Sequence, residues 1–256
     1  MARIVIETPS FKVGKAPIIA DPPCNGQSAC FSGYNQVYLM TGQKGSGKSN
    51  LLYDMIIKNK QAYKGRFDFI YLFTNSNTTN YPDYINQFSD GIDEEVLDVI
   101  LKDETLKGSN ICFIFDDCVS ELIHSKTSKI IGQIMRNTRH VYAKKTETIT
   151  IEDDEGEKIS VEVPLRAPRG TLTVFLTTQV YNEIPLNWRK CASCVICFKP
   201  DIREYEFFVR DNLKNFLNGI DEIVFYNMAW SHKYDNLMIN RTQNKLYKNF
   251  GLMTLK

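Results

Sequence analysis

The sequence has no apolar run long enough to span a membrane and no continuous apolar segment near its start that would act as a signal peptide. It also has no internal repeat and no low-complexity tract. The formal net charge is only +1, so the overall field of the protein does not attract nucleic acid, and a nucleic-acid partner would need a local basic patch. We therefore expect a soluble intracellular protein with no transmembrane segment.

Cysteine is present but does not form a disulfide or metal pattern. The seven cysteines are an odd number without the dense, even spacing of a secreted scaffold, which favours a reducing compartment. Cys191, Cys194 and Cys197 form a C-x-x-C-x-x-C run, but no fourth Cys or His lies at a usual zinc spacing. The pattern favours cysteines packed in a core strand over a metal site.

Apolar segments alternate with helical ones along much of the chain. We expect strands at 36–41, 67–73, 110–115, 172–177 and 193–198, and helices at 50–58, 93–102 and 120–135. This alternation predicts an α/β fold with a mostly parallel central sheet covered by helices on both faces. At 256 residues, the chain fits one domain, 1–256.

Three segments do not follow the alternation. Residues 1–35 read as an N-terminal extension of strands and loops. Residues 146–163 alternate apolar and polar side chains around an acidic tip at 153–156, which predicts an inserted β-hairpin. Residues 200–256 are expected to be β-rich, with strands or hairpins at 204–210, 223–227 and 237–247.

A glycine-rich loop stands between the expected strand 36–41 and the expected helix 50–58. Its pattern G-x-x-x-x-G-K-S is that of a P-loop, in which Lys48 reaches the β- and γ-phosphates and Ser49 binds Mg²⁺. The alternative is a glycine-rich turn with an exposed lysine. The residues expected to bind ATP are Gly42, Gln43, Lys44, Gly45, Ser46, Gly47, Lys48, Ser49 and Asn50.

Two further strand ends carry polar residues suited to phosphate chemistry. Asp116 follows an apolar strand and is expected to hold Mg²⁺, while Asp117 is expected to polarise the attacking water. Asp117 could instead be an acidic helix cap or strand terminus. Gln179 ends another core strand, where it would orient the water or simply lead into a loop. No Asn-Lys-x-Asp motif for GTP and no Leu-Ser-Gly-Gly-Gln transporter signature is present.

Five features, taken in chain order, resemble the FtsK/HerA superfamily. They are the P-loop, Asp116-Asp117, the Arg136 to His140 cluster, the Thr177 to Gln179 strand end, and Ile184-Pro185 before Arg189. The likeness spans 37–198 and is strongest to the genome-packaging ATPases of nucleo-cytoplasmic large DNA viruses, virophages and related viruses. The resemblance implies a RecA-like P-loop ATPase that forms a ring of five or six subunits and pumps double-stranded DNA into a preformed capsid, using ATP and Mg²⁺.

The resemblance also implies an arginine finger, supplied to each site by a neighbouring subunit. Arg139 is the first candidate, with Arg136 and Arg189 as alternatives. Each of them could instead complement the dipole at a helix C-terminus. Further implied features are a location at the viral assembly site in the cytoplasm of the host cell, with virion association left open, and contacts to capsid or portal proteins.

The charge changes sign at residue 146. Residues 136–145 carry four basic side chains and no acid, whereas residues 146–162 carry seven acids and one lysine. We expect Lys144 and Lys145, at the base of the hairpin, to face DNA, and the acidic tip to contact a neighbouring subunit or the portal. A merely solvated hairpin is the alternative.

Two other functions are compatible with a P-loop. One is a small-molecule kinase, and the other is a nucleotide-dependent switch protein that does not translocate. Asp116, Asp117 and Gln179 together favour water as the acceptor over a metabolite.

Overall fold

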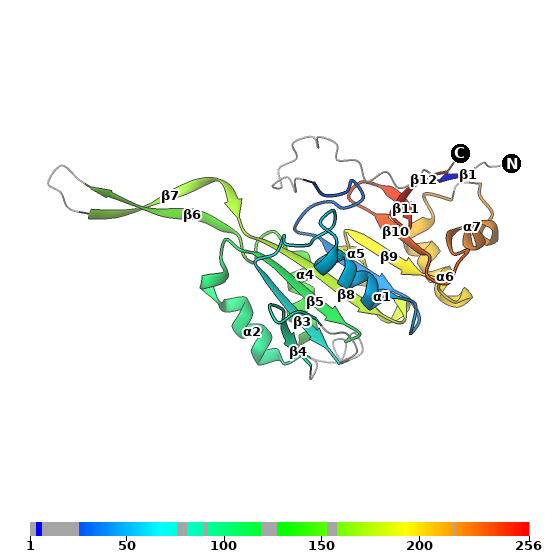
Figure 1. The fold of residues 1–256 in the computed structure, drawn as a ribbon, viewed down its shortest axis with the longest axis horizontal. Helices are drawn as coiled ribbons and strands as arrows, with labels where there is room; N and C mark the ends of the chain where they lie inside the picture. Colours follow the sequence, from blue (N-terminus) through cyan, green and yellow to red (C-terminus); the bar gives the residue numbers. More distant parts are fainter. Residues whose placement is uncertain are drawn as a thin grey trace.

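A ten-stranded mixed sheet crosses the molecule in the order β1-β12-β11-β10-β9-β2-β8-β5-β3-β4 (Figure 1). The computed structural model describes residues 4–6, 26–75, 81–89, 92–118, 127–152, 158–217 and 219–255. In chain order the strands of this sheet are β1 (Ile4–Ile6), β2 (Val37–Thr41), β3 (Phe69–Thr74), β4 (Asn86–Phe88), β5 (Asn110–Asp116), β8 (Thr171–Thr178), β9 (Cys194–Phe198), β10 (Asn236–Asn240), β11 (Lys245–Lys248) and β12 (Gly251–Leu255).

The six strands from β9 to β4 are parallel to one another. Their carboxyl ends therefore meet at one edge of the sheet, which is where open α/β sheets bind ligands. The chain crosses over between them, so β8 lies between β2 and β5 although it follows both of them in sequence. The mostly parallel α/β fold expected from the sequence is confirmed.

Helices cover both faces of the sheet. The helix α1 (Lys48–Tyr53) continues as a wider π-type turn at Asp54–Lys58 and packs on one face. The helices on the other face are α2 (Glu94–Lys102), α4 (Thr127–Arg136), α5 (Leu186–Cys191), α6 (Ile202–Phe208) and α7 (Glu222–Ala229). None of the helices within the described ranges is both long and apolar enough to cross a bilayer.

The C-terminal part corrects one expectation. The segments 204–210 and 223–227, expected as strands, lie in α6, its π-type continuation Val209–Leu213, and α7. Side chains of Asp201 and Asp221 cap the two helices by accepting backbone N–H groups, and this local signal overrides the β preference of the aromatic and branched residues. The expected hairpin at 237–247 is present as β10 and β11.

The inserted hairpin is longer than its expected bounds. It consists of β6 (Lys144–Glu152) and β7 (Lys158–Arg169), which form a separate two-stranded sheet that projects far from the body (Figure 1). The acidic tip at 153–156 lies outside the described residues, as do 7–25 of the N-terminal extension and 120–126 of the helix expected before Arg136.

Gly170 joins the hairpin to the central sheet between β7 and β8. It adopts a φ of +91°, and a Cβ there would lie 2.2 Å from the carbonyl oxygen of Tyr142. Only glycine fits this crossing without displacing backbone. The returning strand of the hairpin therefore leads directly, through one fixed residue, into β8, which ends one residue before Gln179.

Candidate nucleotide site

The P-loop connects β2 to α1 at the carboxyl edge of the sheet. A Cβ on Gly42 would lie 2.6 Å from Cβ of Phe198 and 2.9 Å from Oγ of Ser46, so only glycine allows the loop to cross β9 this closely. The backbone N–H of Ser46 donates to the carbonyl of Gln43, which closes a tight turn before α1 begins. The sequence thus forms the strand, loop and helix order that a phosphate cradle requires.

Lys48 lies in the first turn of α1 and is only 8% exposed. Its ammonium group donates to the carbonyl oxygens of Gly42, at 2.5 Å, and Gln43, at 3.3 Å. Burial lowers the pKa of Lys48 below its usual value, although the nearby carboxylates of Asp117 and Asp116 act in the opposite direction. The loop therefore holds a desolvated cation at its centre, facing two acids.

Asp116 is the last residue of β5 and is 4% exposed. One carboxylate oxygen accepts from the hydroxyl of Ser49 at 3.2 Å, and the other accepts from the hydroxyl of Thr177 at 2.6 Å. The acid thus joins the P-loop helix to the strand β8, which lies between β2 and β5. The structure brings the predicted pair Ser49 and Asp116 together.

Asp117 is exposed and has a left-handed backbone conformation, with a φ of 58°. Asp tolerates this conformation better than most residues. Its backbone N–H donates to the hydroxyl of Thr177 at 2.9 Å, and one carboxylate oxygen accepts from the side-chain amide of Gln179 at 2.7 Å. The two residues expected to handle water are therefore hydrogen-bonded to each other.

Thr177 belongs to the strand end named in the sequence, where only Gln179 is given a role. It is fully buried, donates to Asp116 and accepts from Asp117, so one hydroxyl fixes both acids. The available signal was a polar side chain near the end of an otherwise apolar strand.

The three candidate finger arginines have different surroundings. Arg189, in α5, is 7% exposed and donates to the carboxylate of Asp211, with its guanidinium 5.2 Å from the centre of the Tyr181 ring. The Arg189 guanidinium is therefore engaged by residues of its own chain.

Arg136 and Arg139 are exposed at the opposite edge of the sheet. Arg136 ends α4, and the hydroxyl of Thr138 donates to the carbonyl of Asn35, which precedes β2. The length of β2, roughly 17 Å for five residues, separates that edge from the P-loop. Neither arginine contributes to the nucleotide site of its own chain.

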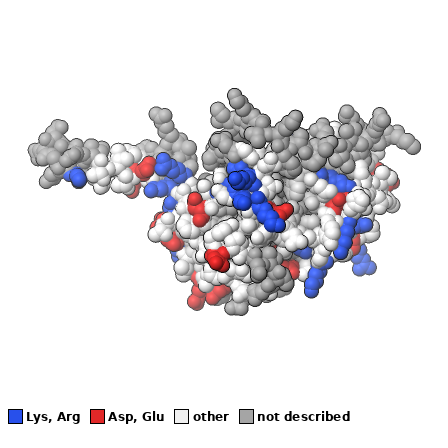
Figure 2. All heavy atoms as spheres, viewed as in Figure 1, with Lys and Arg blue, Asp and Glu red and all other residues white. Residues whose placement is uncertain are grey.

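The base of the hairpin is basic. Lys144 begins β6 and is exposed, and Arg169 ends β7, where it pairs with Glu147 at 3.5 Å. Figure 2 shows Lys and Arg side chains gathered where the hairpin leaves the body. The side chain of Lys145 lies outside the described residues.

The cysteine run is not a metal site. Cys194 and Cys197 lie on β9 and belong to the apolar clusters on opposite faces of the sheet. Burial raises the pKa of the Cys194 thiol to about 12 and that of Cys197 well above its usual range. Both thiols are core residues, as the sequence predicted.

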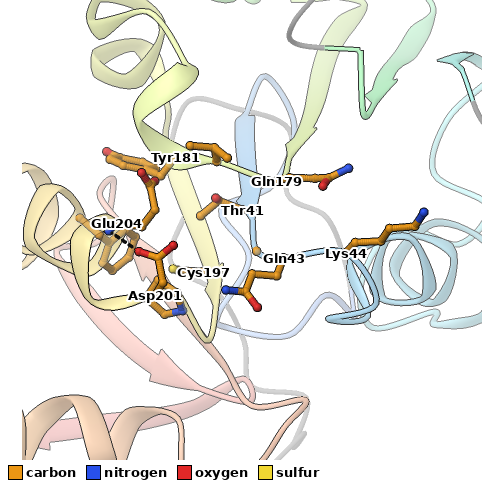
Figure 3. Close-up of a pocket in the computed structure, with 12 residues that line it drawn as sticks. Thr41, Gln43, Lys44, Gln179, Tyr181, Cys197, Asp201 and Glu204 are labelled. Carbon is orange, nitrogen blue, oxygen red and sulfur yellow. Dashed lines mark hydrogen bonds between the residues drawn. The ribbon is translucent and has the colours of Figure 1, made fainter.

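A pocket of about 140 Å³ lies beside the P-loop on the face covered by α6 (Figure 3). It is lined by Gln43 and Lys44 of the loop, by Gln179, and by Asp201 and Glu204 at the start of α6. The Glu204 carboxylate accepts the backbone N–H of Asn182, and that of Asp201 accepts the N–H of Glu204. Asp201 thus caps α6, and Glu204 joins α6 to the turn that follows β8.

Comparison with solved structures identifies the fold. The chain matches the crystal structure of B204, the DNA-packaging ATPase of Sulfolobus turreted icosahedral virus, with a TM-score of 0.55 and 13% identity over 84% of this chain and 97% of that one. The genome packaging NTPase B204 of Sulfolobus turreted icosahedral virus 2 matches in complex with ATPγS (TM-score 0.54, 12% identity) and with AMPPCP (TM-score 0.54, 13% identity), each over 84% of this chain and 96% of that one.

The chain has the B204 fold. No protein-family model matches it, and no curated protein matches it. At 12–13% identity the likeness to B204 concerns the fold alone. The site described above therefore carries the argument about function.

Proposed function

We propose that this chain is an ATP-hydrolysing motor that moves double-stranded DNA into a preformed viral capsid, and that it works as a single P-loop ATPase domain. The observation that carries the proposal is the hydrogen-bonded set Ser49, Asp116, Thr177, Asp117 and Gln179 around a buried P-loop lysine. The shared fold with B204, whose structures hold ATPγS and AMPPCP, supports ATP as the nucleotide.

In the proposed reaction a water oxygen forms a bond to the γ-phosphorus of ATP. The bond from that phosphorus to the β,γ-bridging oxygen breaks, ADP departs with the negative charge, and the proton of the water passes to the carboxylate of Asp117. The amide of Gln179 orients the water, and the ammonium of Lys48 neutralises charge on the phosphates. The hydrogen bond between Gln179 and Asp117 brings both groups to one place.

Mg²⁺ fits the donors present. Magnesium in nucleotide sites is usually bound by one or two protein oxygens and completed by phosphates and water. Ser49 and Asp116 offer a hydroxyl and a carboxylate oxygen 3.2 Å apart. Among the described residues no group of three or more Cys, His, Asp and Glu side chains is placed to hold a metal by itself.

The motor is proposed to be a homo-oligomeric ring of five or six subunits, because Arg139 and Arg136 are at the far edge of the sheet from the P-loop. In a head-to-tail ring each arginine can face the site of the next subunit. DNA is proposed to contact Lys144 and Lys145 at the hairpin base, while the hairpin reaches toward a neighbouring subunit or the portal. The assembly site in the host cytoplasm is the proposed location.

The decisive experiment measures phosphate release from Mg-ATP with and without linear double-stranded DNA. We expect DNA to stimulate the wild-type protein, Lys48→Ala to abolish hydrolysis, and Asp117→Asn to lower kcat about 100-fold or more while ATP still binds. Asp98→Asn and Lys102→Ala, an exposed pair on α2, serve as matched controls and should retain full activity.

Three results would count against the proposal. Wild-type hydrolysis by both site variants would show that the site is wrongly assigned. Transfer of the γ-phosphate to a metabolite without hydrolysis would indicate a kinase. Nucleotide binding without DNA-stimulated hydrolysis would indicate a switch protein.

A further inference from the structure

An exposed aromatic ring stands beside the P-loop. Tyr234 lies on the turn between α7 and β10 and is 62% exposed. The position that a Cβ on Gly47 would occupy is 3.6 Å from Cδ1 of Tyr234 and 3.6 Å from Cε1 of the buried Phe198. A large, solvent-exposed aromatic side chain therefore lies within contact distance of the P-loop.

Tyr234 lies on the flank of the loop opposite the acids. β2 lies between β8 and β9, and Asp116, Asp117 and Gln179 all lie at the carboxyl ends of strands on the β8 side. Tyr234 lies on the β9 side, because Asn236, two residues later, is the register partner of Phe198 at the end of β9. A nucleotide whose γ-phosphate faces the acids would extend its nucleoside toward this other flank.

The turn that carries Tyr234 is held by the next residue. The buried Asp235 carboxylate accepts from the hydroxyl of Ser231, the backbone N–H of His232, the side-chain amide of Asn249 and the ammonium of Lys248, at 2.8–3.0 Å. Burial raises the pKa of Asp235, but these hydrogen bonds outweigh burial and lower it to about 2. The ring is thus mounted on a fixed support before any ligand binds.

The ring has room for a flat partner. Its charged neighbour is Lys233, an exposed lysine whose ammonium lies 5.1 Å from the ring centre. Exposed cation–π contacts are weak, and a lysine side chain is flexible, so a heteroaromatic base can displace it. A ring that already attracts a cation to its face also stacks well on a purine.

We propose that Tyr234 is the base platform of the nucleotide site, on which the adenine ring of bound ATP stacks, and that it favours purine over pyrimidine nucleotides. The inference rests on the proposed function in one respect, that the P-loop binds a nucleoside triphosphate. Tyr234 is a specificity-determining residue in this account and takes no part in phosphate chemistry.

The test compares the affinities of ATP, CTP and inorganic tripolyphosphate by calorimetry with Mg²⁺ present. Tyr234→Ala should weaken ATP binding about tenfold, equivalent to about 1.4 kcal/mol, weaken CTP less, and leave tripolyphosphate unchanged. Tyr234→Phe, which keeps the ring, should bind ATP like the wild type. The matched control is Tyr84→Ala. Tyr84 is equally exposed and precedes β4, the outermost strand on the β3 side of the sheet, so this variant should also bind ATP normally.

Unchanged ATP affinity in Tyr234→Ala would overturn the platform, as would an equal loss for tripolyphosphate, which would indicate general damage to the loop. Failure of the wild type to bind either ATP or tripolyphosphate would overturn both this inference and the proposed function. A base-dependent loss in Tyr234→Ala, in a protein that shows no DNA-stimulated hydrolysis, would support the platform and reject the motor.

Discussion

The hydroxyl of Thr177 holds two adjacent acids, Asp116 and Asp117, for which we propose different roles. Asp116 and Asp117 have the same side chain, yet Asp116 is buried on the strand and Asp117 is exposed beyond it. Thr177 donates to the carboxylate of Asp116 and accepts the backbone N–H of Asp117. It thereby fixes the carboxylate of Asp116, the proposed Mg²⁺ ligand, and the backbone of Asp117.

Replacing Thr177 with valine should impair the proposed metal site without changing its shape. Thr177→Val keeps the volume but removes the donor to Asp116 and leaves the Asp117 N–H without its acceptor. Because hydrogen bonds to metal-binding carboxylates typically contribute about 10–100-fold in metal affinity or activity, we expect a loss in that range, with a higher Mg²⁺ concentration needed for half-maximal rate. Steady-state ATPase assays over a Mg²⁺ series measure this.

The chain offers a matched control for that change. Thr173 is on the same strand, is fully buried, and has no hydrogen-bond partner for its hydroxyl within the described part of the chain. Thr173→Val should retain the wild-type Mg²⁺ dependence. Thr177→Ser keeps the hydroxyl and should therefore also show the wild-type Mg²⁺ dependence. Equal effects of the two valine variants would mean that Thr177 matters only for packing.

Among the larger elements, the hairpin strand β7 and the central strand β8 follow each other directly along the chain. β7 returns from the hairpin tip, passes Gly170 and becomes β8, which ends at Thr178, one residue before Gln179. A force on the hairpin base therefore acts on a strand that reaches the nucleotide site. This connection would give the proposed DNA contact at Lys144 and Lys145 a physical route to hydrolysis.

The paired variant Lys144→Ala, Lys145→Ala should weaken DNA binding in a salt-dependent way. If each lysine neutralises one phosphate, the slope of log affinity against log salt should fall by about 2. Fluorescence anisotropy with labelled duplex at several salt concentrations measures this slope, and Lys102→Ala provides the control on α2. An unchanged slope, or unchanged assembly and DNA-stimulated hydrolysis after deletion of 147–163, would show that the hairpin is only a solvated appendage.

The sequence predicted the elements whose signal is local. Parallel strands buried on both faces are continuous apolar runs, so β3, β5, β8 and β9 were evident. The prediction of strands in the segments of α6 and α7 is wrong, because their aromatic and branched residues favour strands while the capping aspartates before them favour helices. Strand pairing across the sheet is a long-range property, so the sequence alone assigns no role at the site to Thr177 or Tyr234.

At the scale of the whole molecule, the two halves of the proposed catalytic machinery are at opposite edges of one sheet. The P-loop, Asp116 and Gln179 lie at the carboxyl edge of the parallel strands, and Arg139 follows α4 at the amino edge. Because the sheet is rigid, Arg139 cannot reach the P-loop of its own chain. A ring in which the amino edge of one subunit faces the carboxyl edge of the next would unite them.

Mixing two inactive variants tests this arrangement. Lys48→Ala lacks a working P-loop but keeps Arg139, whereas Arg139→Ala keeps the P-loop and lacks the finger, so each alone should lose most activity, by about 1,000-fold or more for the finger. In randomly mixed rings a site works when its own subunit is Arg139→Ala and the subunit facing it is Lys48→Ala. That combination applies to about a quarter of the sites whatever the ring size, so an equimolar mixture should recover up to about a quarter of the wild-type rate.

The same mixture separates the remaining candidates. Arg136→Ala combined with Lys48→Ala should show the recovery instead if Arg136 is the finger, while Arg189→Ala should give a destabilised protein that no partner rescues, since its ion pair with Asp211 is buried. The mixture is assayed at protein concentrations where the wild type is fully active. If its ATPase activity only equals the sum of the activities of the two separate variants, each nucleotide site is complete within its own chain. Recovery that rises with protein concentration would follow from assembly, because a site shared between subunits exists only in the ring.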